Sequence, residues 1–143
     1  MISLLDANVL LALGDENHPH HSAALRFMED VAIRQGWATC PLTENAFLRI
    51  MGRVRPAGGG MSPEDARLSL HSIIANPGHN FWTDDLSLTD SLTFPSLPAA
   101  KDLTDIYLLA LAVKHRARFA TFDAGIDPSL VPGGPQALHL ITP

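Results

Sequence analysis

Short apolar runs alternate with longer amphipathic segments along the chain. Five of these runs have the length of a strand and lie at residues 2–5, 37–40, 80–82, 119–122 and 138–141. The segments between them repeat apolar side chains every three or four residues, which is the spacing of a helix with one buried face. Strands that alternate with helices favour a parallel sheet covered on both faces. The pattern therefore predicts an α/β fold.

Helices are expected in five places, and some have recognisable ends. Their predicted ranges are residues 9–13, 18–36, 44–51, 63–76 and 104–115. His18-Pro19 is expected to open the second helix, since proline is tolerated in a first turn, and Ser62 is expected to cap the fourth. The fifth is apolar nearly all round, as expected of a helix packed against a sheet. Residues 52–61 include Pro56 and three consecutive glycines, so we expect this segment to be mobile.

The composition fits a single domain that spans residues 1–143. A hydrophobic fraction of 46% and a charged fraction of 17% argue against disorder, and no apolar stretch approaches the ~20 residues needed to cross a bilayer. The first residues lack the basic region and cleavage site of a signal peptide. The one cysteine, Cys40, cannot form an internal disulfide and is expected to be a buried strand residue. We therefore expect a cytoplasmic protein that does not bind membranes.

Four acidic residues occupy positions that can meet at one edge of the predicted sheet. Asp6 and Asp123 directly follow the first and fourth strands, and parallel sheets bind ligands at the carboxyl ends of their strands. Glu44 and Asp105 lie in the first turns of helices that follow loops, so they can face the same edge. Each acid alone is also typical of a turn or a helix start. The coincidence of four favours one acidic cluster.

Such a cluster predicts a site for a divalent cation. Carboxylates at short range repel one another, and sites made only of oxygen ligands suit Mg²⁺ or Mn²⁺. One or two such ions can activate water and stabilise the charge that develops on a phosphodiester. The formal net charge of −5 has the wrong sign for a protein that grips nucleic acid with a basic surface. Either nucleic acid is not the partner, or cations bridge the acids to phosphate.

Other chemistries find little support in the sequence. It contains no G-x-x-x-x-G-K-[ST] phosphate loop, no G-x-G-x-x-G after the first strand and no G-x-S-x-G nucleophile elbow. His18, His20 and His21 are crowded enough to suggest zinc, but no second cysteine and no H-E-x-x-H spacing accompanies them. We assign these histidines to a loop and a helix start.

The motifs and their order resemble those of the PIN domain, and in particular of the VapC ribonuclease toxins of VapBC toxin–antitoxin pairs. The matching segments are LLDANVLLAL at 4–13, HPHHSAALRF at 18–27, WATCPLTENAFLRI at 37–50, FWTDDLSL at 81–88, LTDIYLLALAVKH at 103–115 and FATFD at 119–123. They extend over nearly the whole chain, apart from residues 52–80 and those after 124. The resemblance implies a three-layer α/β/α sandwich around a short, mainly parallel five-stranded sheet.

The resemblance also implies roles for individual residues. The residues that would hold Mg²⁺ or Mn²⁺ are Asp6, Glu44, Asp105 and Asp123. Of these, Asp6 and Asp105 would be the most direct ligands. Supporting or capping residues would be Asn8, Thr104 and Thr121, with Asp102 at the edge of the site. Residues that could steer the RNA backbone are Arg49, Arg53 and Arg55.

By the same resemblance, the chain would be a toxin that hydrolyses RNA with metal-activated water and leaves 5′-phosphate and 3′-hydroxyl ends. It would form a homodimer, and a small antitoxin with a basic tail would inhibit it by meeting the acids. Two alternatives remain open, namely a PIN-like module that binds RNA or protein without cutting, and a receiver-like phosphoacceptor domain. The receiver-like alternative is disfavoured because Asp6 has no adjacent acid and no lysine follows Lys114.

Overall fold

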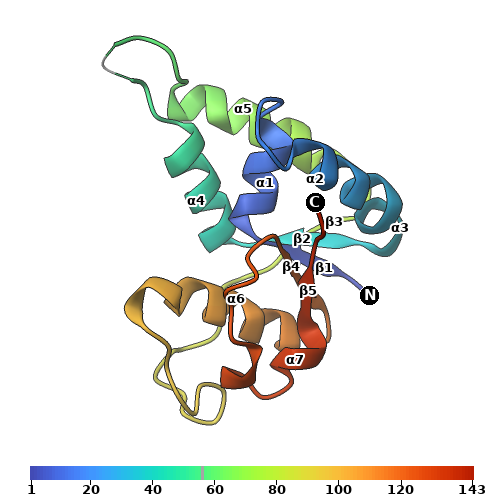
Figure 1. The fold of residues 1–143 in the computed structure, drawn as a ribbon, viewed down its shortest axis with the longest axis vertical. Helices are drawn as coiled ribbons and strands as arrows, with labels where there is room; N and C mark the ends of the chain where they lie inside the picture. Colours follow the sequence, from blue (N-terminus) through green and yellow to red (C-terminus); the bar gives the residue numbers. More distant parts are fainter. Residues whose placement is uncertain (56) are drawn as a thin grey trace.

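The computed structural model describes residues 1–55 and 57–143 and is built around a five-stranded sheet (Figure 1). The strands are β1 (Ser3–Leu5), β2 (Trp37–Thr39), β3 (His79–Phe81), β4 (Arg118–Thr121) and β5 (Leu138–Leu140). They lie in the order β3-β2-β1-β4-β5, and every neighbouring pair is parallel. All five predicted strands are therefore confirmed. Pro56, within the segment expected to be mobile, lies outside the described residues.

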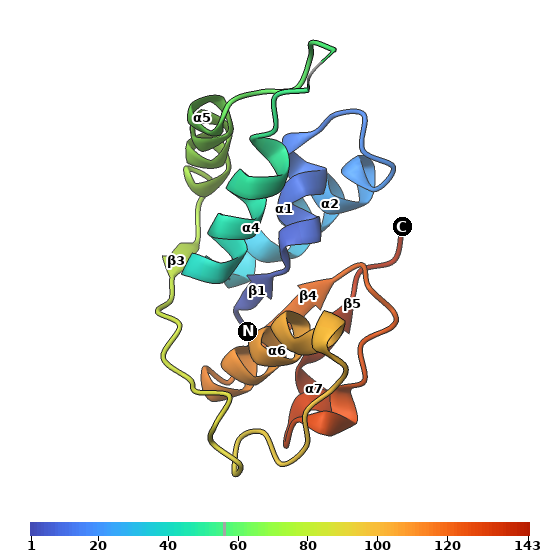
Figure 2. The ribbon, with the colours of Figure 1, turned by 90° about the vertical axis from the view of Figure 1, so that its left-hand side faces the viewer.

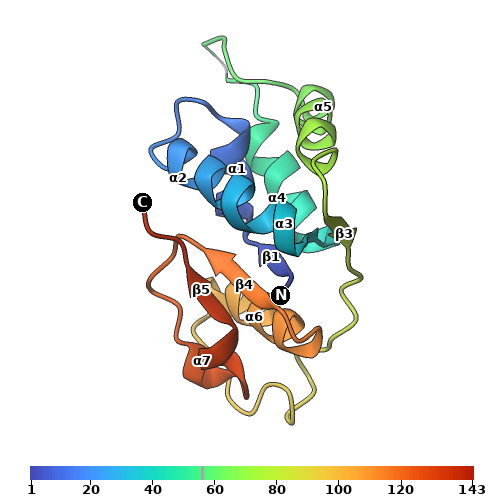
Figure 3. The ribbon, with the colours of Figure 1, turned by 90° about the vertical axis from the view of Figure 1, so that its right-hand side faces the viewer.

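Helices cover both faces of the sheet. One layer holds α1 (Ala7–Gly14), α2 (His21–Phe27), α3 (Ile33–Gln35), α4 (Pro41–Met51) and α5 (Pro63–Ile74), and the other holds α6 (Leu103–Lys114) and α7 (Gly134–Ala137). Figures 2 and 3 show the sheet between these two layers from opposite sides. The predicted three-layer α/β/α sandwich is confirmed. In the described part of the chain, no helix is long and apolar enough to span a membrane.

The two faces of the sheet belong to two separate hydrophobic clusters. In β1, Leu4 packs in the cluster that contains α6, whereas Leu5 packs in the cluster that contains α1 and α4. The same alternation holds in β4 for Phe119 and Ala120. All four side chains are fully buried. A strand that is buried on both faces needs apolar residues at every position, and this explains why the strands are continuous apolar runs.

The segment predicted as one long helix over residues 18–36 differs from the expectation. His18, Pro19 and His20 form a turn, in which the His21 N–H donates to the carbonyl of His18, and α2 begins only at His21. The helix then passes through a π-helical stretch, η1 (Met28–Ala32), before α3. The hydrophobic pattern also did not predict α7 or the 3₁₀ turns η2 (Ala100–Asp102) and η3 (Pro128–Leu130).

Candidate active site

Asp6 lies where the central strand β1 and its neighbour β4 end side by side. Leu5 of β1 pairs with Ala120 of β4, and the Asp6 N–H continues this pairing by donating to the Ala120 carbonyl at 3.0 Å. The Asp6 side chain is nearly buried, with 7% of its surface exposed. Its Oδ2 accepts a hydrogen bond of 2.7 Å from the Thr121 hydroxyl at the end of β4. The strand pairing therefore fixes both the backbone and the carboxylate of Asp6.

Thr121 also ties the loop after β4 to the start of α1. Its Oγ1 accepts hydrogen bonds from the Asn8 side-chain amide at 3.2 Å and from the Asp123 N–H at 3.0 Å. The Asn8 side-chain oxygen Oδ1 accepts in turn from the Phe122 N–H at 3.5 Å. Asp6, Asn8 and the backbone of Asp123 are thus held around one buried hydroxyl.

Asp105 lies in the first turn of α6 and is partly buried. Burial raises the pKa of its carboxyl to about 7, and the negative charges of Asp6, Asp123 and Asp102 add to the increase. Burial also raises the pKa of Asp6, against hydrogen bonds from Thr121 and from two backbone N–H groups. No cation contributes to either shift in the described part of the chain. The aspartates therefore form a group whose charges are close enough to repel and lack a counter-ion.

Glu44 lies in the first turn of α4 and is held by a residue of β2, which lies on the other side of β1 from β4. Its Oε2 accepts a hydrogen bond of 2.6 Å from the Thr39 hydroxyl at the end of β2. His79 Nε2 lies 2.7 Å from the same Thr39 oxygen. Since the one hydroxyl hydrogen of Thr39 goes to Glu44, the ring N–H of His79 donates to Thr39. Sequence reasoning missed both Thr39 and His79, although Thr39 shares the strand-end position that identified the aspartates.

The side chains of Asp6, Glu44, Asp105 and Asp123 suit a hard divalent cation by their chemistry. Their donor atoms are all carboxylate oxygens, which is the donor set that Mg²⁺ and Mn²⁺ prefer, and the mutual repulsion at Asp105 is the kind that a cation relieves. Within residues 1–55 and 57–143, however, no three His, Cys, Asp or Glu side chains form a group that could hold a metal ion as they stand. The carboxylates would have to draw together around an ion.

Comparison with known proteins identifies the family. The family model described as the PIN domain matches residues 3–127. Ribonuclease VapC44 of Mycobacterium tuberculosis is 40% identical over 144 residues, which cover 99% of each chain. The chain belongs to the VapC ribonucleases of the PIN-domain family. Ribonuclease VapC38 of the same organism is 39% identical over 87% of both chains. PIN-domain ribonucleases generally depend on divalent metal ions.

Two solved structures share the fold of this VapC-family chain. One is Mycobacterium tuberculosis VapC20, described as a sarcin-ricin loop cleaving toxin, with a TM-score of 0.63 and 13% identity over 86% of this chain and 91% of that chain. The other is VapBC2 of Rickettsia felis, bound to a DNA fragment from its promoter, with a TM-score of 0.59 and 11% identity over 86% and 89% of the two chains. At these identities the likeness establishes the α/β/α fold.

Several residues singled out in the VapC-like sequence make no hydrogen bond to the aspartates in the described structure. Thr104 is exposed, and α6 has no side-chain cap in the described structure, so the capping role expected of Thr104 is wrong. Asp102 occupies the N-cap position of α6 and acts on Asp105 through its charge, at the edge of the group. Arg49 and Arg53 are exposed at the far end of α4 from Glu44, where the Arg53 Nε–H donates to the Arg49 carbonyl at 3.2 Å.

The histidines and the cysteine have structural environments. His18 Nδ1 accepts from the His20 N–H at 3.0 Å, and His21 Nδ1 lies 2.6 Å from the Ala12 carbonyl oxygen, which confirms the loop and helix-start assignment. Cys40 is buried, one residue beyond β2. Burial raises the pKa of its thiol to about 11, so the thiol stays protonated and unreactive at neutral pH.

Proposed function

We propose that this VapC-family chain is the toxin of a toxin–antitoxin pair and hydrolyses RNA as an endoribonuclease that requires Mg²⁺ or Mn²⁺. The metal-binding and catalytic set is Asp6, Glu44, Asp105 and Asp123. The observation that carries the proposal is the repulsion at Asp105, whose pKa is raised to about 7 by burial and by three neighbouring aspartates. The relatives with 36–40% identity that are named ribonucleases support RNA as the substrate.

Each residue of the proposed site has a separate role in this reaction. A bound divalent cation supplies a Lewis acid that activates water and neutralises charge on the phosphodiester. Asp6 and Asp105 would hold the ion most directly, and the Thr121 hydroxyl fixes the orientation of Asp6. Asn8 holds the loop that carries Asp123. Glu44, oriented by Thr39, completes the set as a ligand or as a base that positions water.

The negative charge of the proposed site also indicates how the ribonuclease would be inhibited. The net charge of −5 and the group of aspartates around Asp105 would weaken the binding of RNA at the acids when metal is absent. A small antitoxin with a basic tail would find complementary charge at the same place. The VapBC2 structure of Rickettsia felis, which shares the fold, supports an antitoxin as the partner. We further propose that the toxin acts as a homodimer in the cytoplasm.

The ends of the RNA products test this function. Purified protein is incubated with single-stranded RNA in Mg²⁺, in Mn²⁺ and with a chelator, and the product ends are mapped. We expect cleavage only with metal, with 5′-phosphate and 3′-hydroxyl ends, because attack by water does not use the ribose 2′-hydroxyl. Products with a 2′,3′-cyclic phosphate would overturn the mechanism. RNA binding without cleavage in either metal would favour the alternative of a non-cutting PIN-like module.

A further inference from the structure

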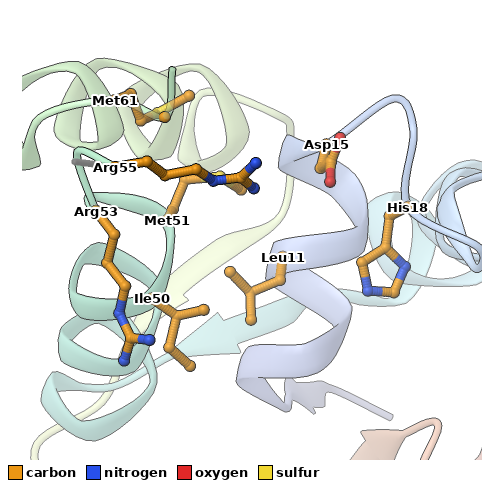
Figure 4. A pocket seen from close by; sticks show the side chains of 9 residues that line it. Leu11, Asp15, His18, Ile50, Met51, Arg53, Arg55 and Met61 are labelled. Atoms are coloured by element: carbon orange, nitrogen blue, oxygen red, sulfur yellow. The ribbon is translucent and has the colours of Figure 1, made fainter. Parts of the chain in front are cut away.

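A cavity of about 590 Å³ lies in the helical layer beyond the carboxylates. It opens between α1, the C-terminal end of α4 and the described parts of the segment 52–61 (Figure 4). Its apolar lining comes from Leu11, Ile50, Met51 and Met61. Its charged lining comes from Arg53, Arg55 and Asp15, with His18 beside Asp15. Cavities of this size with apolar walls and a few polar groups are typical of sites for small organic groups.

The two helices that line the cavity also carry the candidate active site at their other ends. Leu11 is five residues beyond Asp6, and Ile50 is six residues beyond Glu44. At 1.5 Å per residue, the cavity begins roughly 8–9 Å from the acids along both helix axes. Helices α1 and α4 lie side by side (Figures 1 and 2). Asp15 is nine residues beyond Asp6, or roughly 14 Å along α1, so a base one or two nucleotides from the scissile bond can reach the charged part of the cavity.

The segment that carries Arg55 has a defined shape. Val54 and Gly60 form an antiparallel bridge, and the Arg55 N–H donates to the Gly59 carbonyl at 3.0 Å. Gly60 has a φ of +78°, and a Cβ at this position would lie 2.0 Å from the Arg53 carbonyl oxygen. Only glycine fits this close approach. The described backbone thus forms a turn that places Arg55 on the wall of the cavity.

Opposite charges face each other across the cavity. Figure 4 shows Arg55 extending from one wall toward Asp15 on the other. Among the described residues they form no ion pair, and Asp15 Oδ1 accepts the Asn17 N–H at 3.0 Å. A ligand that lies between these two groups must present acceptors to the guanidinium and donors to the carboxylate.

We propose that this cavity binds an unpaired guanine base of the RNA substrate, one or two nucleotides from the bond that is cut. Guanine presents O6 and N7 as acceptors to Arg55, which is a common bidentate pairing, and N1–H and N2–H as donors to Asp15. Adenine would turn its N1 lone pair toward the carboxylate, which is repulsive. The apolar side chains contact the faces of the base, and Arg53 faces the adjoining phosphate. The base must be unpaired because it has to leave its stack to enter.

This inference rests on the proposed function, and its test is separate from cleavage. Two fluorescently labelled oligouridines that carry one central guanine or one central adenine are titrated with the full chain in the presence of chelator, so that binding is measured without metal. We expect the guanine oligonucleotide to bind about tenfold more tightly, as is typical of a bidentate contact to a base. Both Arg55→Ala and Asp15→Asn should reduce this preference to less than about threefold.

Arg34→Ala is the matched control, because Arg34 is exposed on α3 and its removal changes the net charge equally. This variant should keep the preference for guanine. Equal affinity for both oligonucleotides, no measurable binding of either, or the same loss of preference in Arg34→Ala as in Arg55→Ala would each overturn the inference and favour a protein segment as the occupant. A chain that cleaves RNA with metal but shows no guanine preference would retain the proposed function and lose this inference alone.

Discussion

The Thr121 hydroxyl donates a 2.7 Å hydrogen bond to Asp6 Oδ2 and so joins the ends of β1 and β4. The two residues are 115 positions apart in the sequence, and both side chains are buried. The same hydroxyl oxygen accepts from Asn8 and from the Asp123 backbone. One small side chain therefore orients the Asp6 carboxylate and the Asn8 amide and holds the Asp123 backbone, and it opposes the effect of burial on the pKa of Asp6.

Replacement of this threonine by the isosteric valine should damage both stability and activity. Thr121→Val leaves Asp6, Asn8 and the Asp123 N–H without their shared partner, which should cost on the order of 2 kcal/mol of unfolding free energy. Misplaced supporting groups at metal sites lower activity by about 10–100-fold, and we expect a loss in this range. Urea denaturation and RNA cleavage at saturating Mg²⁺ measure the two effects. Thr83→Val, at an exposed loop position, is the control and should change neither. Equal behaviour of the two variants would contradict the role of Thr121.

Asp105 should stabilise the metal-free protein less as the pH rises. The pKa of Asp105 is raised from 3.8 to about 7 in the folded state, so between these values the folded protein holds a proton that the unfolded chain has released. The stabilisation is present at pH 4 and is lost as the pH passes 7. The loss should be on the order of 2 kcal/mol, since the side chain is only partly buried. Denaturation with chelator between pH 5 and pH 8 measures it.

The variant Asp105→Asn should flatten this pH dependence, because the amide does not titrate. Asp30→Asn, at an exposed position on η1, is the matched control and should keep the pH dependence of the parent chain. If the parent protein and Asp105→Asn changed equally in stability between pH 5 and pH 8, the pKa of Asp105 would not be raised in the folded protein.

Divalent metal should stabilise the folded chain. An ion that binds only the folded state at about 100 times its Kd adds about 2.7 kcal/mol, which corresponds to a rise in Tm of roughly 5–10 °C for a domain of this size. We expect this rise with Mg²⁺ or Mn²⁺ at pH 8. It should be absent from Asp6→Asn and preserved in Asp30→Asn, as measured by calorimetry. Equal increases in both variants would place the ion elsewhere on the protein.

His79 should act on catalysis through Thr39 and Glu44. Removal of the ring N–H in His79→Ala frees the Thr39 hydroxyl to rotate away from Glu44. The Mg²⁺ concentration for half-maximal cleavage should then rise about tenfold. His79→Gln, which keeps an N–H donor, should recover part of this loss. His71→Ala, at an exposed position on α5, should have no effect, and a similar shift in His71→Ala would argue against the relay.

Much of the fold follows from local pattern. Strands such as β1 and β4 are buried on both faces, so they stand out as apolar runs, and Asp6 and Asp123 end those runs abruptly. The topology of a parallel sheet then brings their positions to one edge. For this reason, the sequence alone predicts that the strand-end aspartates are neighbours.

Other features depend on distant partners and left no signal in the sequence. Thr104 and Thr121 each lie close to a predicted aspartate, yet only Thr121 points into the site. The contact between Thr39 and His79 spans 40 positions and arises because β2 pairs with β3. The π-helical stretch η1 has the same apolar spacing as an ordinary helix, so periodicity could not reveal it.

The most direct test of the central claim is the rate of RNA cleavage at saturating Mg²⁺ for Asp6→Asn and Asp105→Asn beside Asp30→Asn. Each substitution removes one negative charge with almost no change in side-chain size. If the aspartates bind the catalytic metal, the first two variants should fold like the parent and lose more than roughly 100-fold in rate, while the third keeps it. Parental cleavage rates in both folded site variants would contradict the account.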